Sequence, residues 1–199
     1  MRYMEGQASG PTTPAKDRLL HAAVEHLAGQ GISDLSLRRL AAALGTSHRM
    51  LIYHFGSRGG LLVEVVRAVE AQQRQILAEL RQQPGTCPQD VARSFWRRLT
   101  DPSLAPQERL FFELYGQALH GRPYAAPLLD NVIDSWLEPL TATLQDGDDP
   151  DRATPADARL ALAVARGLLL DLLATNDHAG VDAAFERYLA TFFRTPAPH

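Results

Sequence analysis

The sequence predicts an all-α protein of about nine helices. Apolar residues recur three and four positions apart through most of the chain, which is the spacing of one face of an α-helix. Few windows alternate apolar and polar residues with a period of two, and β-branched residues are sparse. The 199 residues, of which 45% are hydrophobic, suffice for one large or two modest globular domains.

The first helix is expected to follow a disordered tail. Residues 1–12 mix Gly, Ser, Thr, Pro and Gln, a composition that cannot bury enough apolar surface to fold. Thr13-Pro14 then has the pattern of a helix start, with proline in the first turn. Gly29 and Gly31 are placed to end this helix. Its apolar stripe is expected to contain Leu20, Ala23, Val24 and Leu27.

Residues 36–55 predict two short helices joined by a tight turn. Ser36 and Ser47 are placed to cap the two helices, and Gly45 permits the sharp turn between them. The inward-facing residues are expected to be Leu37, Leu40, Ala41, Leu44, Leu51 and Phe55. Gly56-Ser57 ends the second helix. This is the pattern of a helix-turn-helix motif, in which the second helix enters the DNA major groove.

The rest of the chain is expected to form six further helices. The first is long and covers about 60–83, where Pro84-Gly85 stops it. The others are expected at roughly 89–100, 106–120, 125–145, 155–176 and 180–194. We therefore divide the chain into a DNA-binding domain at 13–60 and a helical effector-binding and dimerisation domain at 61–199.

The charge distribution also points to DNA at the N-terminal end. Residues 1–60 carry seven Lys and Arg against four Asp and Glu, a balance of +3, which leaves −6 for residues 61–199 in a chain of net charge −3. A basic head on an acidic body suits a polyanionic partner. The outward face of the second short helix is polar, basic and aromatic, with His48, Arg49, Tyr53 and His54.

Residues 15–75 resemble the DNA-binding domain of the TetR family of bacterial regulators. The matching residues are Leu19, Leu20, Ala22, Ala23, Gly31, Ser36, Arg38, Leu40, Ala41, Gly45, Ser47, Tyr53, His54, Phe55, Ser57, Arg58 and Leu61. Three positions depart from the family pattern, namely Leu37, Ile52 and Gly59. The resemblance implies a sequence-specific transcriptional regulator, a repressor that a small-molecule effector releases from its operator. It also implies a homodimer on a quasi-palindromic double-stranded DNA site.

The same resemblance implies which residues contact DNA. Arg38, Tyr53, His54 and Arg58 would bind phosphates, and His48, Arg49 and Met50 would approach base edges beside the cap residue Ser47. Arginine can bond guanine O6 and N7 together, which gives direct base readout. Contact of Arg49 with the DNA backbone alone is the alternative.

Aromatic residues in the middle of the chain are candidates for the effector pocket. They are Phe95, Trp96, Phe111, Phe112, Tyr115 and Trp136. By the resemblance, this region encloses an apolar ligand. Their helical spacing is equally typical of core packing. Arg97, Glu113 and His120 are further candidates for polar groups in the pocket.

The last two expected helices are candidates for the dimer interface. The segment from Leu160 to Ala174 is apolar nearly all round and needs burial on two sides. By the resemblance, the two helices pair with their symmetry mates in a four-helix bundle. The interface residues are expected to be Leu160, Val164, Leu168, Leu172, Phe185, Leu189 and Phe192.

Several other classes of protein are disfavoured by the sequence. It has no Gly-rich phosphate loop, paired catalytic carboxylates or nucleophile elbow, so we expect no enzyme and no cofactor. His21 and His26 lie about 140° apart around a helix, so we expect no metal site there. Cys87 is the sole cysteine, which excludes an intrachain disulfide. Without a signal peptide or membrane span, a cytoplasmic location is expected.

Two alternative functions remain open from the sequence. A helical ligand-binding protein or enzyme that retains the N-terminal motif would show no sequence-specific DNA binding. A DNA-compacting protein would bind all sequences alike, although the acidic net charge of −3 argues against it.

Overall fold

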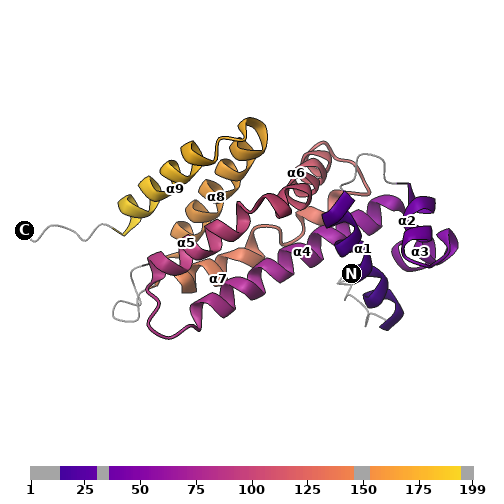
Figure 1. Ribbon diagram of the computed structural model, residues 1–199, viewed down its shortest axis with the longest axis horizontal. Coiled ribbons are helices and arrows are strands. Elements are labelled where there is room, and N and C mark those ends of the chain that lie inside the picture. Colours follow the sequence, from indigo (N-terminus) through magenta and orange to yellow (C-terminus); the bar gives the residue numbers. More distant parts are fainter. Residues whose placement is uncertain (1–13, 31–35, 146–152, 194–199) are drawn as a thin grey trace, which may run out of the picture.

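The computed structural model describes residues 14–30, 36–145 and 153–193, and within these ranges the protein is entirely helical (Figure 1). In chain order the elements are α1 (Pro14–Gln30), α2 (Leu37–Ala43), α3 (His48–Phe55), α4 (Arg58–Arg81), α5 (Pro88–Leu99), the 3-10 turn η1 (Pro102–Leu104), α6 (Ala105–Leu119), the 3-10 turn η2 (Ala126–Leu129), α7 (Asp134–Leu144), α8 (Pro155–Thr175) and α9 (His178–Phe192). The expected tail at 1–12 and the helix signals Thr13 and Gly31 lie outside the described residues.

Helices α1, α2 and α3 form a small head against the start of α4. Their buried side chains are those of the predicted apolar stripes, with Ala23, Leu40 and Leu51 each at most 1% exposed. The head does not have a core of its own, because the same cluster of buried residues includes Leu110 and Val132 from the second half of the chain. The head is therefore packed directly onto the body.

Helix α4 connects the head to the body. Its 24 residues make a rod of about 36 Å, and Figure 1 shows it running from α2 and α3 to the far ends of α5 and α7. Its first two turns bury Leu61, Leu62 and Val65 in the cluster shared with the head. Leu77, near its other end, packs in a second cluster with residues of α5, α7, α8 and α9.

The predicted helices agree with the structure except at 125–145. That segment is a 3-10 turn followed by the shorter helix α7, so the expectation of one continuous helix is wrong. Asn131 has a φ of 62°, a left-handed conformation that no residue inside an α-helix adopts. Proline at 127 lies in the 3-10 turn, while Pro139 is tolerated inside α7, where its carbonyl accepts a hydrogen bond from Thr143 Oγ1.

Helix α4 also holds the η2 turn. The Arg67 guanidinium donates a hydrogen bond to the carbonyl of Pro127 and lies 3.8 Å from the Asp130 carboxylate. No helix in the described part of the chain is both long and apolar enough to cross a membrane.

Candidate functional site

Side-chain caps and one left-handed glycine fix the geometry of the helix-turn-helix. The hydroxyl of Ser36 accepts a hydrogen bond from the backbone N–H of Arg39, and that of Ser47 from Met50, both at 3.2 Å. Each bond satisfies a donor that the first turn of a helix leaves free. Gly45 has a φ of 63°, the conformation that the turn between α2 and α3 requires.

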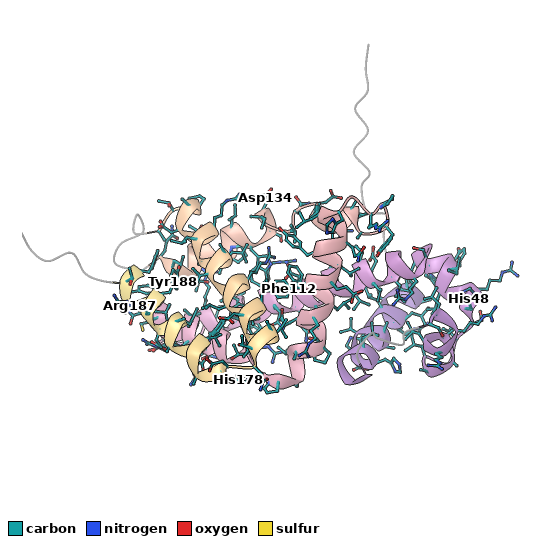
Figure 2. The ribbon with its side chains drawn as sticks, turned by 90° about the horizontal axis from the view of Figure 1, so that it is seen from above. His48, Phe112, Asp134, His178, Arg187 and Tyr188 are labelled. Atoms are coloured by element: carbon teal, nitrogen blue, oxygen red, sulfur yellow. The ribbon has the colours of Figure 1, made fainter. Side chains whose placement is uncertain are left out.

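The outer face of α3 is open and carries most of the predicted DNA contacts. Ser47, His48 and Arg49 are exposed, and Tyr53 is exposed by 78% of its surface. Figure 2 shows His48 at one end of the molecule, pointing away from the body. Met50 and Ile52 of α3 are exposed as well, and so are Arg38 of α2 and Arg58 of α4. A helix with only Leu51 and Phe55 fully buried presents its remaining side chains to a partner.

His54 differs from the other predicted contacts because it is half-buried. Its ring lies edge-on to Tyr53, with 5.0 Å between the ring centres. The Nε2 atom is buried without a hydrogen-bond partner among the described residues. His54 could therefore reach a DNA phosphate only through Nδ1.

Two of the departures from the family pattern have packing reasons. Leu37 is buried in the head core and is not available to a DNA phosphate. The Tyr124 ring lies against the backbone of Gly59, so that any side chain at 59 would overlap it. A side chain at Gly60 would likewise overlap the carbonyl of Phe55. Glycine at 59 and 60 thus allows the start of α4 to pack closely against Tyr124 and Phe55.

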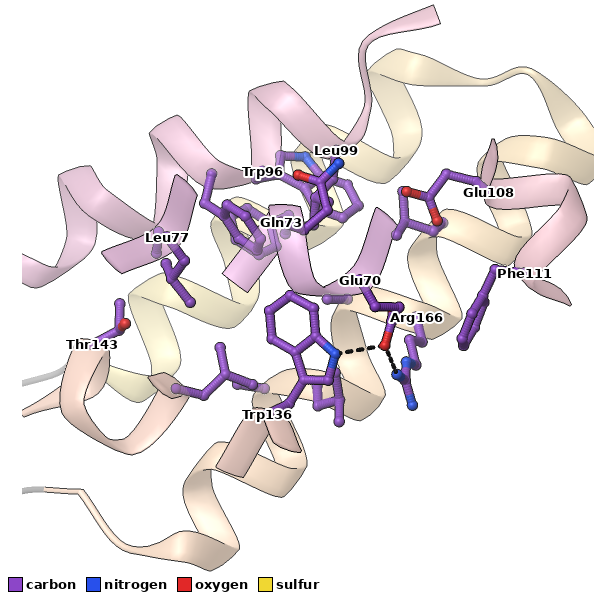
Figure 3. Close-up of a pocket in the computed structure, with 18 of the residues that line it drawn as sticks. Glu70, Gln73, Leu77, Trp96, Leu99, Glu108, Phe111, Trp136, Thr143 and Arg166 are labelled. Carbon is purple, nitrogen blue, oxygen red and sulfur yellow. Dashed lines mark hydrogen bonds and ion pairs between the residues drawn. The ribbon is translucent and has the colours of Figure 1, made fainter. Parts of the chain in front are cut away.

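The body encloses a large cavity between α4, α5, α6, α7, α8 and α9 (Figure 3). It contains about 1030 Å³ of space free of atoms, counted out to its opening. Five of the six predicted pocket residues line it, namely Phe95, Trp96, Phe111, Phe112 and Trp136. Tyr115 is not in the lining and stacks on Phe111 instead, with 5.5 Å between ring centres.

A carboxylate, an indole and a guanidinium meet at one wall of the cavity. Figure 3 shows Glu70 accepting a hydrogen bond from Trp136 Nε1 at 2.8 Å and from Arg166 at 3.3 Å. Arg166 also donates to the carbonyl of Val132 at 3.0 Å and lies 4.8 Å from the centre of the Phe111 ring. Burial raises the pKa of Glu70, and the positive charge of Arg166 opposes that rise. Glu70 is thus an ion-paired carboxylate that accepts both hydrogen bonds through Oε2.

Three other polar groups of the lining have no such partners. Glu108 makes no hydrogen bond or ion pair with any described residue, and burial together with Glu70 raises its pKa to about 7. Gln73 is 4% exposed, and its Oε1 has no partner in the described structure. The same is true of the Tyr188 hydroxyl, whose pKa burial raises to about 12. These groups are free to meet a ligand.

The polar residues expected in the pocket were the wrong ones. Arg97, Glu113 and His120 are exposed and do not line the cavity, because they lie on the outer faces of α5 and α6. The lining instead uses Glu70 and Gln73, which fall on the stripe that also contains Val66 and Leu77. The sequence signal that would have identified Glu70 and Gln73 is their spacing, because both lie three or four residues from apolar residues of the buried helix face.

The predicted interface residues divide between the core and the surface. Leu172, Phe185 and Leu189 are at most 8% exposed and pack within the chain, while Val164, Leu168 and Phe192 are partly buried. Leu160 is 52% exposed. The exposed face of α8 comprises Leu160, Ala163, Gly167, Leu170 and Ala174, which are spaced three and four residues apart.

The described residues contain no group of three His, Cys, Asp or Glu side chains that could hold a metal ion. His21 and Glu25 form an exposed pair at 3.3 Å. Cys87 is exposed, with its Sγ 3.2 Å from an oxygen of Asp90.

Comparison with known proteins gives one family match, at the N-terminal end, and several structures of similar fold. Residues 19–65 match the model for bacterial regulatory proteins of the tetR family. The structure of the multidrug binding protein EbrR complexed with imidazole is 27% identical, with a TM-score of 0.64 over 98% of this chain and 100% of that chain. EbrR complexed with proflavin is 26% identical, with a TM-score of 0.60 over 89% and 99%.

A third structure has the same fold. It is a transcriptional regulator from Saccharomonospora viridis in complex with choline, 24% identical with a TM-score of 0.64 over 89% of this chain and 94% of that chain. None of the curated proteins that were compared matches the chain.

Proposed function

We propose, from the match of residues 19–65 to the model for bacterial regulatory proteins of the tetR family, that the chain is a transcriptional repressor released from its operator by a small molecule. In this proposal it acts in the cytoplasm as a homodimer. Two copies of α3 enter successive major grooves of a quasi-palindromic site, about 34–36 Å apart. The observation that carries the proposal is the open outer face of a well-capped α3.

The chemistry of this face suits base readout combined with phosphate binding. Arg49 is exposed beside the N-terminus of α3, the end of a recognition helix that contacts base edges. Arg38, Tyr53 and Arg58 are also exposed and are groups that can bind phosphates. Met50 and Ile52 add exposed apolar surface, which suits contact with a thymine methyl group.

The exposed stripe on α8 supports the dimer. Leu160 and Leu170 are each 52% exposed, and small residues between them allow another helix to approach closely. The spacing of three and four residues is that of helices packed side by side. We therefore place the interface on this stripe and on the outer face of α9, rather than on the buried Phe185 and Leu189.

The cavity supports a small-molecule effector. Pockets for such ligands are mainly apolar with a few polar groups, and the lining of this cavity has that character. EbrR was solved with imidazole and with proflavin, and the Saccharomonospora viridis regulator with choline. A small organic molecule in the corresponding part of this chain is consistent with those complexes.

Arg166 offers a physical route from the cavity to the head. It joins Glu70, in the cavity wall, to the carbonyl of Val132, whose side chain is buried in the cluster shared with the head. A ligand that competes for Glu70 would loosen this link. The head is then free to move relative to the body, which changes the separation of the two α3 helices in the dimer.

Selection of bound sites from random DNA tests the proposal. We expect a two-fold-symmetric site, and we expect Arg49→Ala to lose preference at one position in each half-site. Arg81→Ala, at the other end of α4, is the control and should select the same site as the native protein. Recovery of no enriched sequence at any salt concentration would reject a regulator, and equal binding of all sequences would indicate DNA compaction.

A further inference from the structure

We propose that the cavity selects an organic cation with a bulky apolar body, and that the Glu108 carboxylate is the main counter-ion, with Glu70 as the second. The inference rests on the proposed function in that it names the chemical class of the effector. It is carried by the charge balance of the cavity, by its unpartnered acceptors and by its aromatic walls.

The charge balance of the cavity is negative. Its charged lining residues are Glu70, Glu108 and Arg166. The single cation is already engaged, since Arg166 lies 3.3 Å from Glu70 and 3.0 Å from the carbonyl of Val132. Glu108 is left without a partner in the described structure. Glu108 is half-buried, and taking a carboxylate partly out of water without a partner is costly, so a bound cation would reduce that cost.

Neutral acceptors add to the preference for a cation. Gln73 Oε1 and the Tyr188 hydroxyl are buried in the lining without hydrogen-bond partners among the described residues. An ammonium or a ring N–H of a ligand can donate to Gln73 Oε1, whereas the Tyr188 hydroxyl can accept from a cation or donate to an anion and does not discriminate between them. These acceptors come from α4 and α9, whereas Glu108 comes from α6, so they reach the cavity from different sides.

The walls suit the rest of such a ligand. Phe95, Trp96 and Phe112 come from two helices and face the cavity together with Trp136. Aromatic faces attract cations through the ring quadrupole and also bury apolar surface. Arg166 already lies 4.8 Å from the centre of the Phe111 ring, so one cation is held in this way by the protein itself.

An anionic ligand is the alternative that the structure disfavours. Arg166 Nη1 is buried without a partner and could donate to an anion. An anion placed there would, however, lie near the carboxylate of Glu70, which Arg166 binds through its other terminal nitrogen. It would also add a negative charge to a cavity whose lining already has two carboxylates and one guanidinium.

A proton competes with the ligand for Glu108. The charged and titratable groups around it are Glu70 on α4, Arg166 on α8 and Tyr188 on α9, while α5 contributes only apolar residues to the cavity. Glu108 also lines a second, open pocket, whose lining includes Asp101, Arg109 and His178. Burial and the charge of Glu70 raise the pKa of Glu108 to about 7. Affinity for a cation should therefore rise as the pH passes through 7.

The test uses two probes of the same size and opposite charge, tetraphenylphosphonium and tetraphenylborate. Their binding to the full-length protein is measured by titration calorimetry in the absence of DNA. We expect the phosphonium to bind at least about tenfold more tightly than the borate. For a single competing proton of pKa about 7, its affinity should fall by up to about 30-fold from pH 8 to pH 5.5.

Glu108→Gln should weaken phosphonium binding at pH 8 by about tenfold and flatten the pH dependence. Glu113→Gln removes the same charge from the exposed face of α6 and should leave both unchanged. Equal or tighter binding of the borate, no binding of either probe, or a Glu108→Gln protein with native affinity would each overturn the inference. The two probes on the native protein keep the test valid even if the variant folds poorly.

Release of operator DNA is measured separately. Phosphonium binding that depends on Glu108 but does not release the operator would contradict the proposed regulatory function and leave the selectivity of the cavity intact.

Discussion

Glu108 should make the folded protein less stable as the pH rises, and Glu108→Gln should abolish that effect. The pKa of this carboxyl is raised from 4.5 to about 7 by burial and by Glu70. Between these two values the folded protein binds a proton that the unfolded chain has released. The contribution of Glu108 to the unfolding free energy is therefore favourable at pH 4.5 and is lost as the pH rises to 7.

The size of the effect follows from the shift. One pKa unit corresponds to about 1.36 kcal/mol, so a change from 4.5 to about 7 gives an upper limit of about 3 kcal/mol. Glu108 retains some solvent contact, which lowers the expected value to about 1–3 kcal/mol. The variant should be the more stable protein at pH 8, and its advantage should shrink steadily towards pH 5.

Urea unfolding followed by circular dichroism at pH 5, 6, 7 and 8 measures this difference. The two proteins are compared at one protomer concentration, because dimer formation would contribute to stability. Asp101, Asp157 and Glu186 have pKa values lowered by hydrogen bonds, but they titrate in both proteins and cancel in the difference. A difference that stays constant across this range would refute the reasoning. Glu113→Gln is the control and should follow the native curve.

Two further substitutions probe the other wall of the cavity and the head. Arg166→Met should lower the unfolding free energy at pH 7 by about 2 kcal/mol, because it leaves the Glu70 carboxylate partly buried without its ion-pair partner; an unchanged urea midpoint would contradict this. Gly60→Ala should cost about 1–3 kcal/mol, because the added methyl group overlaps the carbonyl of Phe55. It should weaken operator binding more than phosphonium binding, and equal loss of both would show that the damage is not confined to the head.

Most of the helices could be predicted because their apolar stripes are regular and their ends carry clear signals. Ser36 and Ser47 cap their helices as expected, and the predicted inward residues Leu40 and Leu51 are almost fully buried. The exposure of Arg49 and Tyr53 follows from the same helical phase. Local sequence fixes these features, so no knowledge of the tertiary structure is needed.

The segment at 125–145 and the polar groups of the cavity could not be predicted in this way. The left-handed Asn131 separates η2 from α7 within a stretch whose apolar pattern predicts a single helix. Glu70 and Arg166 lie 96 residues apart in the sequence, and only the packing of α4 against α8 brings them together. The cavity aromatics were identified by type, but their spacing alone could not separate a wall from a core.

The two carboxylates of the cavity, Glu70 and Glu108, differ in their partners, and only Glu70 has an evident role in holding the fold together. Glu70 binds Trp136 and Arg166 through Oε2, as expected of a partly buried charge that holds helices together. Glu108 lies in the same cavity without any such partner among the described residues, and burial disfavours its charged form. Glutamine at position 108 would not lower the unfolding free energy at neutral pH. Its presence is better explained by a ligand that supplies the missing positive charge, since interactions that weaken the free protein can strengthen a complex.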